Sequence, residues 1–155
     1  MIPFHSYYQK NVPGFENSYI YDSASQIGTR GSRRLIGLHV LTGDEARAGK
    51  KFDDTVGIFR QGVPLTWPPD KPVTNVELPY RCFVPVKLER LLVVGRCFSS
   101  DQAANSMFNV IPHCVQTGQA AGTAAALAVK SKVLPRQVVI KTLKKRLVAQ
   151  DVELP

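Results

Sequence analysis

The sequence lacks the features that mark membrane-spanning and disulfide-stapled proteins. Its 155 residues contain no apolar run of about 20 residues, the length that crosses a bilayer. The alanine-rich stretch 120–129 is too short and contains Gly122. The three cysteines, Cys82, Cys97 and Cys114, are odd in number and form no C-x-x-C pair, which argues against a disulfide framework or a structural zinc site. We therefore expect reduced, partly buried thiols and no metal centre.

Targeting and common catalytic signatures are missing as well. The first residues show neither the basic start nor the apolar core of a secretory signal, so we expect a cytoplasmic protein. The sequence has no G-x-S-x-G elbow, no H-E-x-x-H helix and no P-loop. His113 beside Cys114 does not replace them, because adjacent helical residues point about 100° apart. The chemistries that depend on these motifs are therefore excluded.

The composition that is present fits one folded domain with a basic surface. Hydrophobic residues make up 44% of the chain and charged residues 21%, which is typical of globular proteins and not of disordered ones. Twenty Lys and Arg against 12 Asp and Glu give a net charge of +8. This balance favours anionic partners such as nucleotides, nucleic acids or acidic metabolites, although a solvated basic surface explains the same charge.

Hydrophobic periodicity and turn residues predict both helices and strands. Helices are expected at residues 4–10, after a cap at Thr42, at 112–130 and at 141–150. Strands are expected at residues 18–22, 35–41, 54–59, 83–86 and 91–94. Residues 60–80 contain five prolines and are expected to be irregular extended chain.

The most informative stretch combines the strand at 91–94, which ends in Gly95, with the helix that begins at Pro112. The N–H groups at the start of a helix carry partial positive charge, and α/β proteins use them to bind anionic or electron-rich ligands. Small residues at helical spacing are typical of close packing against a sheet or another helix: Gly118, Ala121, Gly122 and Ala125. Simple close packing without a ligand is the alternative interpretation of this helix.

Three sets of segments also carry a family resemblance: residues 11–17; residues 27–37 with 40–44 and 52–54; and residues 79–82, 92–101, 111–114 and 118–122. In this order they resemble the C-terminal part of FAD-dependent oxidoreductases with the glutathione-reductase-type fold. The resemblance implies an α/β fold, the C-terminal part of a two-domain FAD-binding fold in which a Gly/Ala-rich helix packs on the sheet. Residues 1–75 would belong to the substrate or cap region, and residues 76–155 to the FAD-binding domain.

The resemblance implies FAD as the cofactor and an organic small molecule as the substrate. In the family, the Gly-Arg-Cys segment approaches the ribityl and pyrophosphate part of FAD, and the following helix points its N-terminus at the isoalloxazine ring. The implied cofactor-binding residues are Gly95, Arg96, Cys97, Pro112, His113, Cys114, Val115 and Gln116.

Catalytic residues are less well defined by the resemblance, and the candidates are Arg33, Asn105 and His113. The family often has histidines and an arginine where this chain has Gln102, Asn105 and Asn109, and an amide cannot act as an acid or base at neutral pH. The basic run Arg30, Arg33 and Arg34 either orients a substrate carboxylate, supports the flavin site, or forms a basic strand edge with salt bridges.

The family's G-x-G-x-x-G loop, which holds the ADP half of FAD, is absent from the sequence. The glycine pairs 28/31 and 118/122 have the wrong spacing. We therefore expect the N-terminal Rossmann unit to lie outside this chain, so that the chain alone binds FAD weakly and is inactive. A partner chain or a homo-oligomer would complete the fold.

Two other functions remain open. The segment Gly28-Thr-Arg-Gly31 has the form of a KH-type GxxG loop, and the basic charge would suit a nucleic-acid-binding module. A single GxxG is a weak signal, and the proline-rich segment does not fit so small a domain, so we expect no nucleic acid partner. The chain could also be a non-catalytic fragment or one subunit of a split enzyme.

Overall fold

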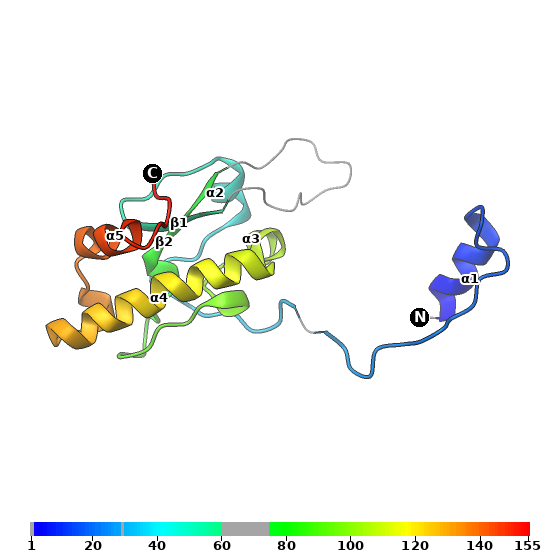
Figure 1. Cartoon of the computed structure of the whole chain (residues 1–155), viewed down its shortest axis with the longest axis horizontal. Coiled ribbons are helices and arrows are strands. Elements are labelled where there is room, and N and C mark those ends of the chain that lie inside the picture. Colours follow the sequence, from blue (N-terminus) through cyan, green and yellow to red (C-terminus); the bar gives the residue numbers. More distant parts are fainter. Residues whose placement is uncertain (1, 29, 60–74) are drawn as a thin grey trace.

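The computed structural model describes residues 2–28, 30–59 and 75–155 (Figure 1). Within these ranges the helices are α1 (Ile2–Asn11), α2 (Gly43–Arg47), α3 (Gln102–Phe108), α4 (Ile111–Ser131) and α5 (Ile140–Val148). The strands are β1 (Thr55–Phe59) and β2 (Val76–Pro79). Three short 3₁₀ turns complete the set: η1 (Tyr80–Cys82), η2 (Gly95–Cys97) and η3 (Pro135–Gln137).

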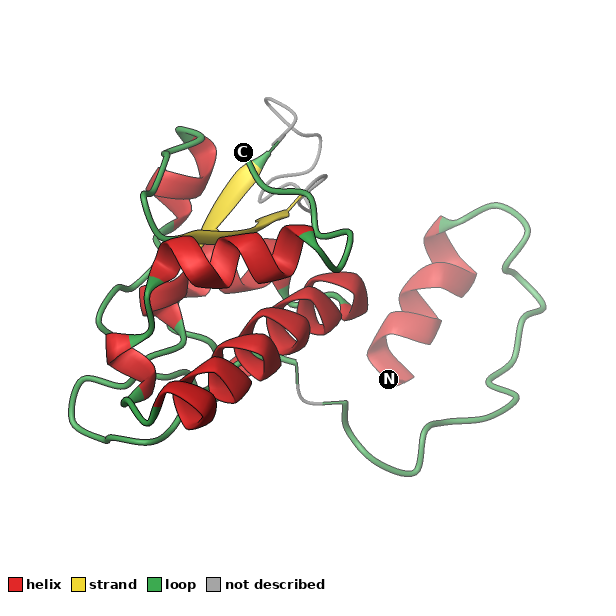
Figure 2. Cartoon of the chain, turned by 60° about the vertical axis from the view of Figure 1, so that its left-hand side comes forward, coloured by secondary structure: helices red, strands yellow, loops and turns green. Residues whose placement is uncertain are grey.

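The two strands form an antiparallel pair that anchors the packed body of the molecule. Thr55 lies opposite Pro79 and Phe59 opposite Val76, with an irregularity in register between these ends. β1 contacts both α4 and α5, which lie side by side in Figures 1 and 2. Aromatic and aliphatic side chains fill the space between them, including Phe59, Phe83, Phe98, Phe108, Met107, Leu143 and Leu147.

Two buried carboxylates fasten the sheet to the chain around it. Glu77 on β2 accepts hydrogen bonds from the Thr55 hydroxyl (2.6 Å) and the Phe52 N–H (3.0 Å), and pairs with Lys51 (2.8 Å). Burial raises the pKa of Glu77, but these three donors outweigh it and leave the pKa below its ordinary value. Asp54 accepts from Arg81 Nε and Nη2, at 3.0 Å each. Both carboxylates therefore act in the structure of the sheet.

The N-terminal part of the chain stands apart from this body. Figures 1 and 2 show α1 at the end of a long extended connection that leads to the body. The aromatic side chains of this arm are exposed, with Tyr21 90% accessible. Tyr8 and Phe15 pack on each other, with ring centroids 5.3 Å apart. The arm is thus held together locally and not by the core.

Most predicted helices are confirmed by the structure. Thr42 caps α2, and Glu45 completes a capping box with it. The cap at Thr42, followed by the acidic residues Asp44 and Glu45, predicts this helix start. Pro112 lies in the first turn of α4. On α5, Leu143 and Leu147 are both buried. The expected helix at residues 4–10 is α1, and the strand expected at 54–59 is β1.

Four predicted strands are wrong: residues 18–22, 35–41, 83–86 and 91–94 form no strand. A strand needs one partner along its length, whereas residues 35–41 donate backbone hydrogen bonds in turn to Cys97, Val84, Arg81 and Ser99. Residues 35–41 make two single bridges, Gly37 to Pro85 and Leu41 to Ser100. In residues 91–94, the N–H of Val93 donates to the carbonyl of Phe83 at 2.9 Å. A short extended segment with one such bond stays irregular.

The expectation for residues 60–80 is wrong at its end, where residues 76–79 form β2, and residues 60–74 lie outside the described part of the chain. The described part is a small α/β structure with a two-stranded sheet and five helices. The predicted boundary between residues 75 and 76 falls between two strands that pair with each other, so both sides share one core. The assignment of residues 1–75 to a substrate region stays a prediction.

A search of the described residues for membrane-spanning helices gives none of sufficient length and hydropathy.

Candidate functional site

Gly95 connects the turn η2 to the middle of α4. Its φ of +69° is in the left-handed region, which glycine adopts without the cost that a side chain imposes. The Gly95 N–H donates to the Thr117 hydroxyl at 2.9 Å, and that hydroxyl donates to the carbonyl of Cys114 at 2.7 Å. Space around the Gly95 Cα is open, since an added Cβ would meet no atom within 4 Å. The backbone here is therefore fixed and accessible.

Arg96 extends from the same turn to the start of α4. Its Nε donates to the carbonyl of Asn109 at 2.9 Å, directly before Val110, the N-cap residue of the helix. The carbonyl of Arg96 in turn accepts from the Nδ2 of Asn105 at 2.9 Å. The Gly-Arg turn and the helix start, predicted to converge, are thus brought together by these bonds.

A third segment, far away in sequence, reaches the same place. Arg30 Nη2 donates to Asn109 Oδ1. Gly31 lies so close to Asn105 that an added Cβ would come within 2.7 Å of its Oδ1. The contact leaves no room for a side chain at position 31. Arg30 therefore reaches Asn109 through a tight approach between the two segments.

The start of α4 offers further donors. Val110 provides no side-chain cap, and Ile111 is 69% exposed. The partial positive charge of the helix end is therefore close to the arginine side chain of η2. A carboxylate, a phosphate or an electron-rich ring edge is the kind of group that such an end stabilises.

The other predicted cofactor residues lie on a different flank of α4. His113 is buried and stacks on Phe59, with ring centroids 4.2 Å apart, and also contacts the ring of Phe108. The Gln116 side-chain amide, oriented to satisfy both groups, lies 3.2 Å from the N and the O of Ile58 on β1. These two side chains fix the helix to the sheet.

A hollow of about 410 Å³ opens beside these residues. Its lining combines the start of α4 with the C-terminal segment: Ile58, Pro112, His113, Val115, Gln116, Gln119, Asp151, Val152 and Glu153. The two carboxylates make this hollow a poor place for a phosphate, because like charges repel. The structure therefore separates Pro112, Val115 and Gln116 from the arginine side of the helix.

The three catalytic candidates are in different environments. Arg33 is exposed, and no hydrogen bond or ion pair among the described residues involves it. Asn105 is buried, and its amide is used on Arg96 and Ser100. His113 lies between aromatic rings of the core. The structure does not bring these three side chains together as one catalytic group.

The cysteines are free, and they differ in exposure. Cys82 is buried, and burial raises the pKa of its thiol to about 12, so that it stays protonated. Cys114 is half-buried. Cys97, in η2, is exposed, so the expectation of a partly buried thiol is wrong at this position, because the turn lies on the open side of α4. Among the described residues no group of side chains forms a metal site.

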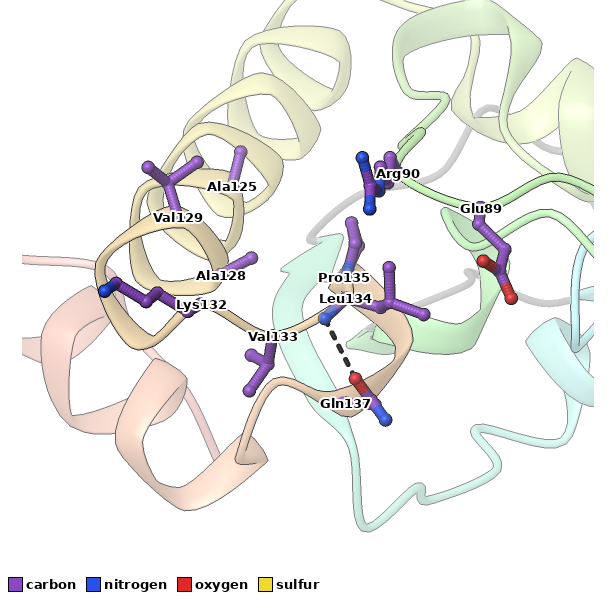
Figure 3. A pocket seen from close by; sticks show the side chains of 10 residues that line it. All are labelled: Glu89, Arg90, Ala125, Ala128, Val129, Lys132, Val133, Leu134, Pro135 and Gln137. Atoms are coloured by element: carbon purple, nitrogen blue, oxygen red, sulfur yellow. Dashed lines mark hydrogen bonds between the residues drawn. The ribbon is translucent and has the colours of Figure 1, made fainter.

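A larger hollow of about 640 Å³ lies at the opposite end of α4 (Figure 3). Alanine and valine side chains of the helix form one wall, and the loop of Val133 to Gln137 forms another. Figure 3 shows the Leu134 N–H donating to Gln137 Oε1, at 3.0 Å, which closes this loop on itself. None of the predicted site residues lines this hollow.

The donor set at the start of α4 fits one side of a nucleotide cofactor. Arg96, the open helix end and the accessible backbone at Gly95 supply positive charge and close approach. A glycine-rich phosphate loop is missing from the sequence. These features are of the kind that α/β proteins use to bind an electron-rich or anionic group at a helix N-terminus.

A comparison with known protein families identifies the family to which the chain belongs. The sequence profile of the family described as FAD dependent oxidoreductase matches residues 4–147. The chain belongs to this family, whose cofactor is FAD. No curated protein and no solved structure matches the chain significantly.

Sequence reasoning missed the central place of Asn109. The residue was noted as a departure from the family pattern, but it joins Arg30, 79 positions away, to Arg96. No local pattern marks such a contact, because it depends on how distant segments pack. Thr117 was missed for the same reason, since its hydroxyl accepts a hydrogen bond from the N–H of Gly95, 22 positions away.

Proposed function

We propose that this chain supplies the ribityl and flavin-ring side of the FAD site in an oxidoreductase of the glutathione-reductase-type fold. The reaction transfers a hydride or an electron pair between an organic small-molecule substrate and the flavin. The observation that carries the proposal is the junction at Asn109, where Arg96 meets the start of α4. Family membership supplies the identity of the cofactor.

Each residue of the junction has a role in this proposal. The backbone at Gly95 lets the cofactor approach closely, because no side chain covers it. Arg96 and the end of α4 stabilise negative charge on the ribityl–phosphate portion or on the reduced ring. FAD, when bound, supplies the redox chemistry, while the chain's residues orient it.

The phosphate loop for the ADP half comes from outside these 155 residues in this proposal, since the sequence contains no G-x-G-x-x-G. A partner chain or a further segment would complete the site, because a second copy of this chain lacks the same loop. The isolated chain is then inactive and binds FAD weakly. The nucleic-acid alternative is less favoured, because Arg30 and Gly31 of the GxxG segment contact Asn109 and Asn105.

Equilibrium dialysis of the chain against FAD, FMN and ADP at equal ionic strength tests the proposal. We expect weak binding with a preference for the flavin compounds, because the chain supplies the flavin side. Gly95→Val should remove that preference. Gly49→Val is the matched control, since Gly49 also has a positive φ (+59°) and open space, but lies after α2.

Either of two outcomes would contradict the proposal. Tight FAD binding by the isolated chain would mean that no outside loop is needed. ADP binding as strong as FMN binding would mean that the chain does not supply the flavin side.

A further inference from the structure

Two arginines from distant parts of the chain hold the same asparagine. Arg30 donates through Nη2 to the side-chain oxygen of Asn109, and Arg96 donates through Nε to its backbone oxygen. Each guanidinium has several further N–H donors, arranged as a fork that suits carboxylate and phosphate oxygens. Both guanidinium groups therefore reach the same residue, and each keeps N–H donors that Asn109 does not use.

The charge of this pair is not balanced by a carboxylate in the described structure. The ion pairs among the described residues use other cations: His39 and Lys50 with Glu45, Arg47 with Asp44, Lys51 with Glu77, and Arg81 with Asp54. Asp101, near Arg96 in sequence, accepts from the backbone N–H groups of Gly43 and Ala104. Asn109 between the arginines is neutral. Two adjacent positive charges repel each other and attract an anion.

Arg30 and Arg96 are both exposed, and the buried asparagines beneath them fix their positions. Asn105 is buried and holds the carbonyl of Arg96. Gly31, next to Arg30, fits against the same asparagine where no side chain has room. Asn105 thus holds the backbone at Arg96 and lies against Gly31, and Asn109 holds both guanidinium groups. Such preorganisation lowers the entropy cost of binding a ligand.

We propose that Arg30 and Arg96 form a binding site for an oxyanion group, a carboxylate or a phosphate, above Asn109. The ligand's origin, though not the site, rests on the proposed function: a phosphate would belong to the cofactor and a carboxylate to the organic substrate. Arg30 is then a binding residue that joins the N-terminal part of the chain to the site on α4. The ligand bridges the two forks and neutralises their repulsion.

Titration of the whole chain with inorganic phosphate, and separately with acetate, tests the site at constant ionic strength. Nuclear magnetic resonance of the arginine Nε–H groups reports binding. We expect saturable shifts at Arg30 and Arg96, and a loss of about tenfold or more in affinity for Arg30→Gln and for Arg96→Gln. Arg146→Gln, which removes an exposed charge on α5, should leave the affinity unchanged.

The outcomes separate the two sources. Tighter phosphate binding supports the site and a cofactor phosphate; tighter acetate binding supports the site and a substrate carboxylate. Shifts that do not saturate with either ion overturn the site. An equal loss of affinity in Arg146→Gln also overturns it, because the effect would then be one of net charge.

Asn109→Asp gives a second, independent test. A carboxylate at this position should pair with both arginines, raise Tm by about 2–4 °C and remove phosphate and acetate binding. A lowered Tm with retained anion affinity would contradict the inference. If the chain binds anions but dialysis shows no preference for flavin compounds, only the proposed function is contradicted. If the chain prefers flavin compounds but binds no anion saturably, only this inference is contradicted.

Discussion

The two faces of α4 differ in what covers them. The inner face is buried against the sheet and the core, through His113, Thr117, Ala120, Ala121, Ala124 and Ala128. The outer face is apolar or small as well, but it is exposed, and its residues recur at spacings of four and three: Ile111, Val115, Gly118, Gly122, Ala125 and Val129. Val129 is 80% accessible and Val115 is 65% accessible.

This difference shows where the described chain is a packed unit and where it is open. The inner face is completed by contacts within the chain, including the Gln116 amide on Ile58. On the outer face, an added Cβ at Gly118 or Gly122 would meet no atom within 4 Å. An exposed apolar stripe of this length is typical of a surface that another element covers. Within the described residues, no other element covers this stripe.

The largest difference between the faces should appear when a charge is placed on each. Ala124 is fully buried, and Ala125 beside it is exposed. Ala124→Glu should lower the free energy of unfolding by about 3 kcal/mol or more, because it buries a charge without a partner. Ala125→Glu should change it by less than about 0.5 kcal/mol. Urea denaturation followed by circular dichroism measures both, and similar losses in the two variants would contradict the assignment of the faces.

The two-stranded sheet, on which the inner face of α4 packs, depends on the ionised form of Glu77. Its pKa is lowered in the folded state, so its contribution to stability is present above the ordinary value of 4.5 and is lost as pH falls through the lowered value. Glu77→Gln should cost about 1–2 kcal/mol at neutral pH, and this gap should close as pH falls through the lowered pKa of Glu77. Chemical denaturation across this pH range measures the gap.

Glu89→Gln is the control for this experiment, because Glu89 is exposed in a loop. It should follow the native pH dependence. A gap between native chain and Glu77→Gln that stays constant from neutral to acid pH would mean that the charge of Glu77 does not support the sheet.

Sequence alone predicted the elements whose signals are local. The Thr42–Glu45 capping box lies within one helical turn, and Pro112 marks the first turn of α4. Leu143 and Leu147 recur on one face of an otherwise basic helix, so the period points to the core. These patterns depend on residues that are close in the chain, and the structure shows each of them as predicted.

The predictions that failed depend on contacts between distant segments. Strand formation at residues 91–94 requires a neighbouring strand, which composition cannot supply. The inner face of α4 could not be chosen from its period, because both faces carry small or apolar residues; of the predicted stripe, only Ala121 is buried. The order of strand end, glycine turn and helix start predicted that Gly95 and Arg96 converge on the helix. The contact from Arg30 to Asn109 follows from packing alone.

The smallest expected effect tests the outer face itself. Gly118→Ala and Gly122→Ala should each raise the free energy of unfolding of the chain by about 0.5–1 kcal/mol, because alanine favours the helix and the added methyl group meets open space. Gly57→Ala is the control on the inner side: its Cβ would lie 3.0 Å from a Gln116 side-chain carbon, so it should not stabilise.

Sedimentation measurements on the same variants report self-association. If the outer face docks closely on a second copy, the alanine substitutions should weaken association although they stabilise the single chain. The native chain should self-associate at concentrations in the range of tens of micromolar, and the double alanine variant should associate less, because two methyl groups separate the helix backbone from its neighbour. Greater stability together with weaker association cannot come from helix propensity alone, since propensity acts on the single chain. A native chain that remains monomeric at these concentrations would contradict docking of a second copy on this face.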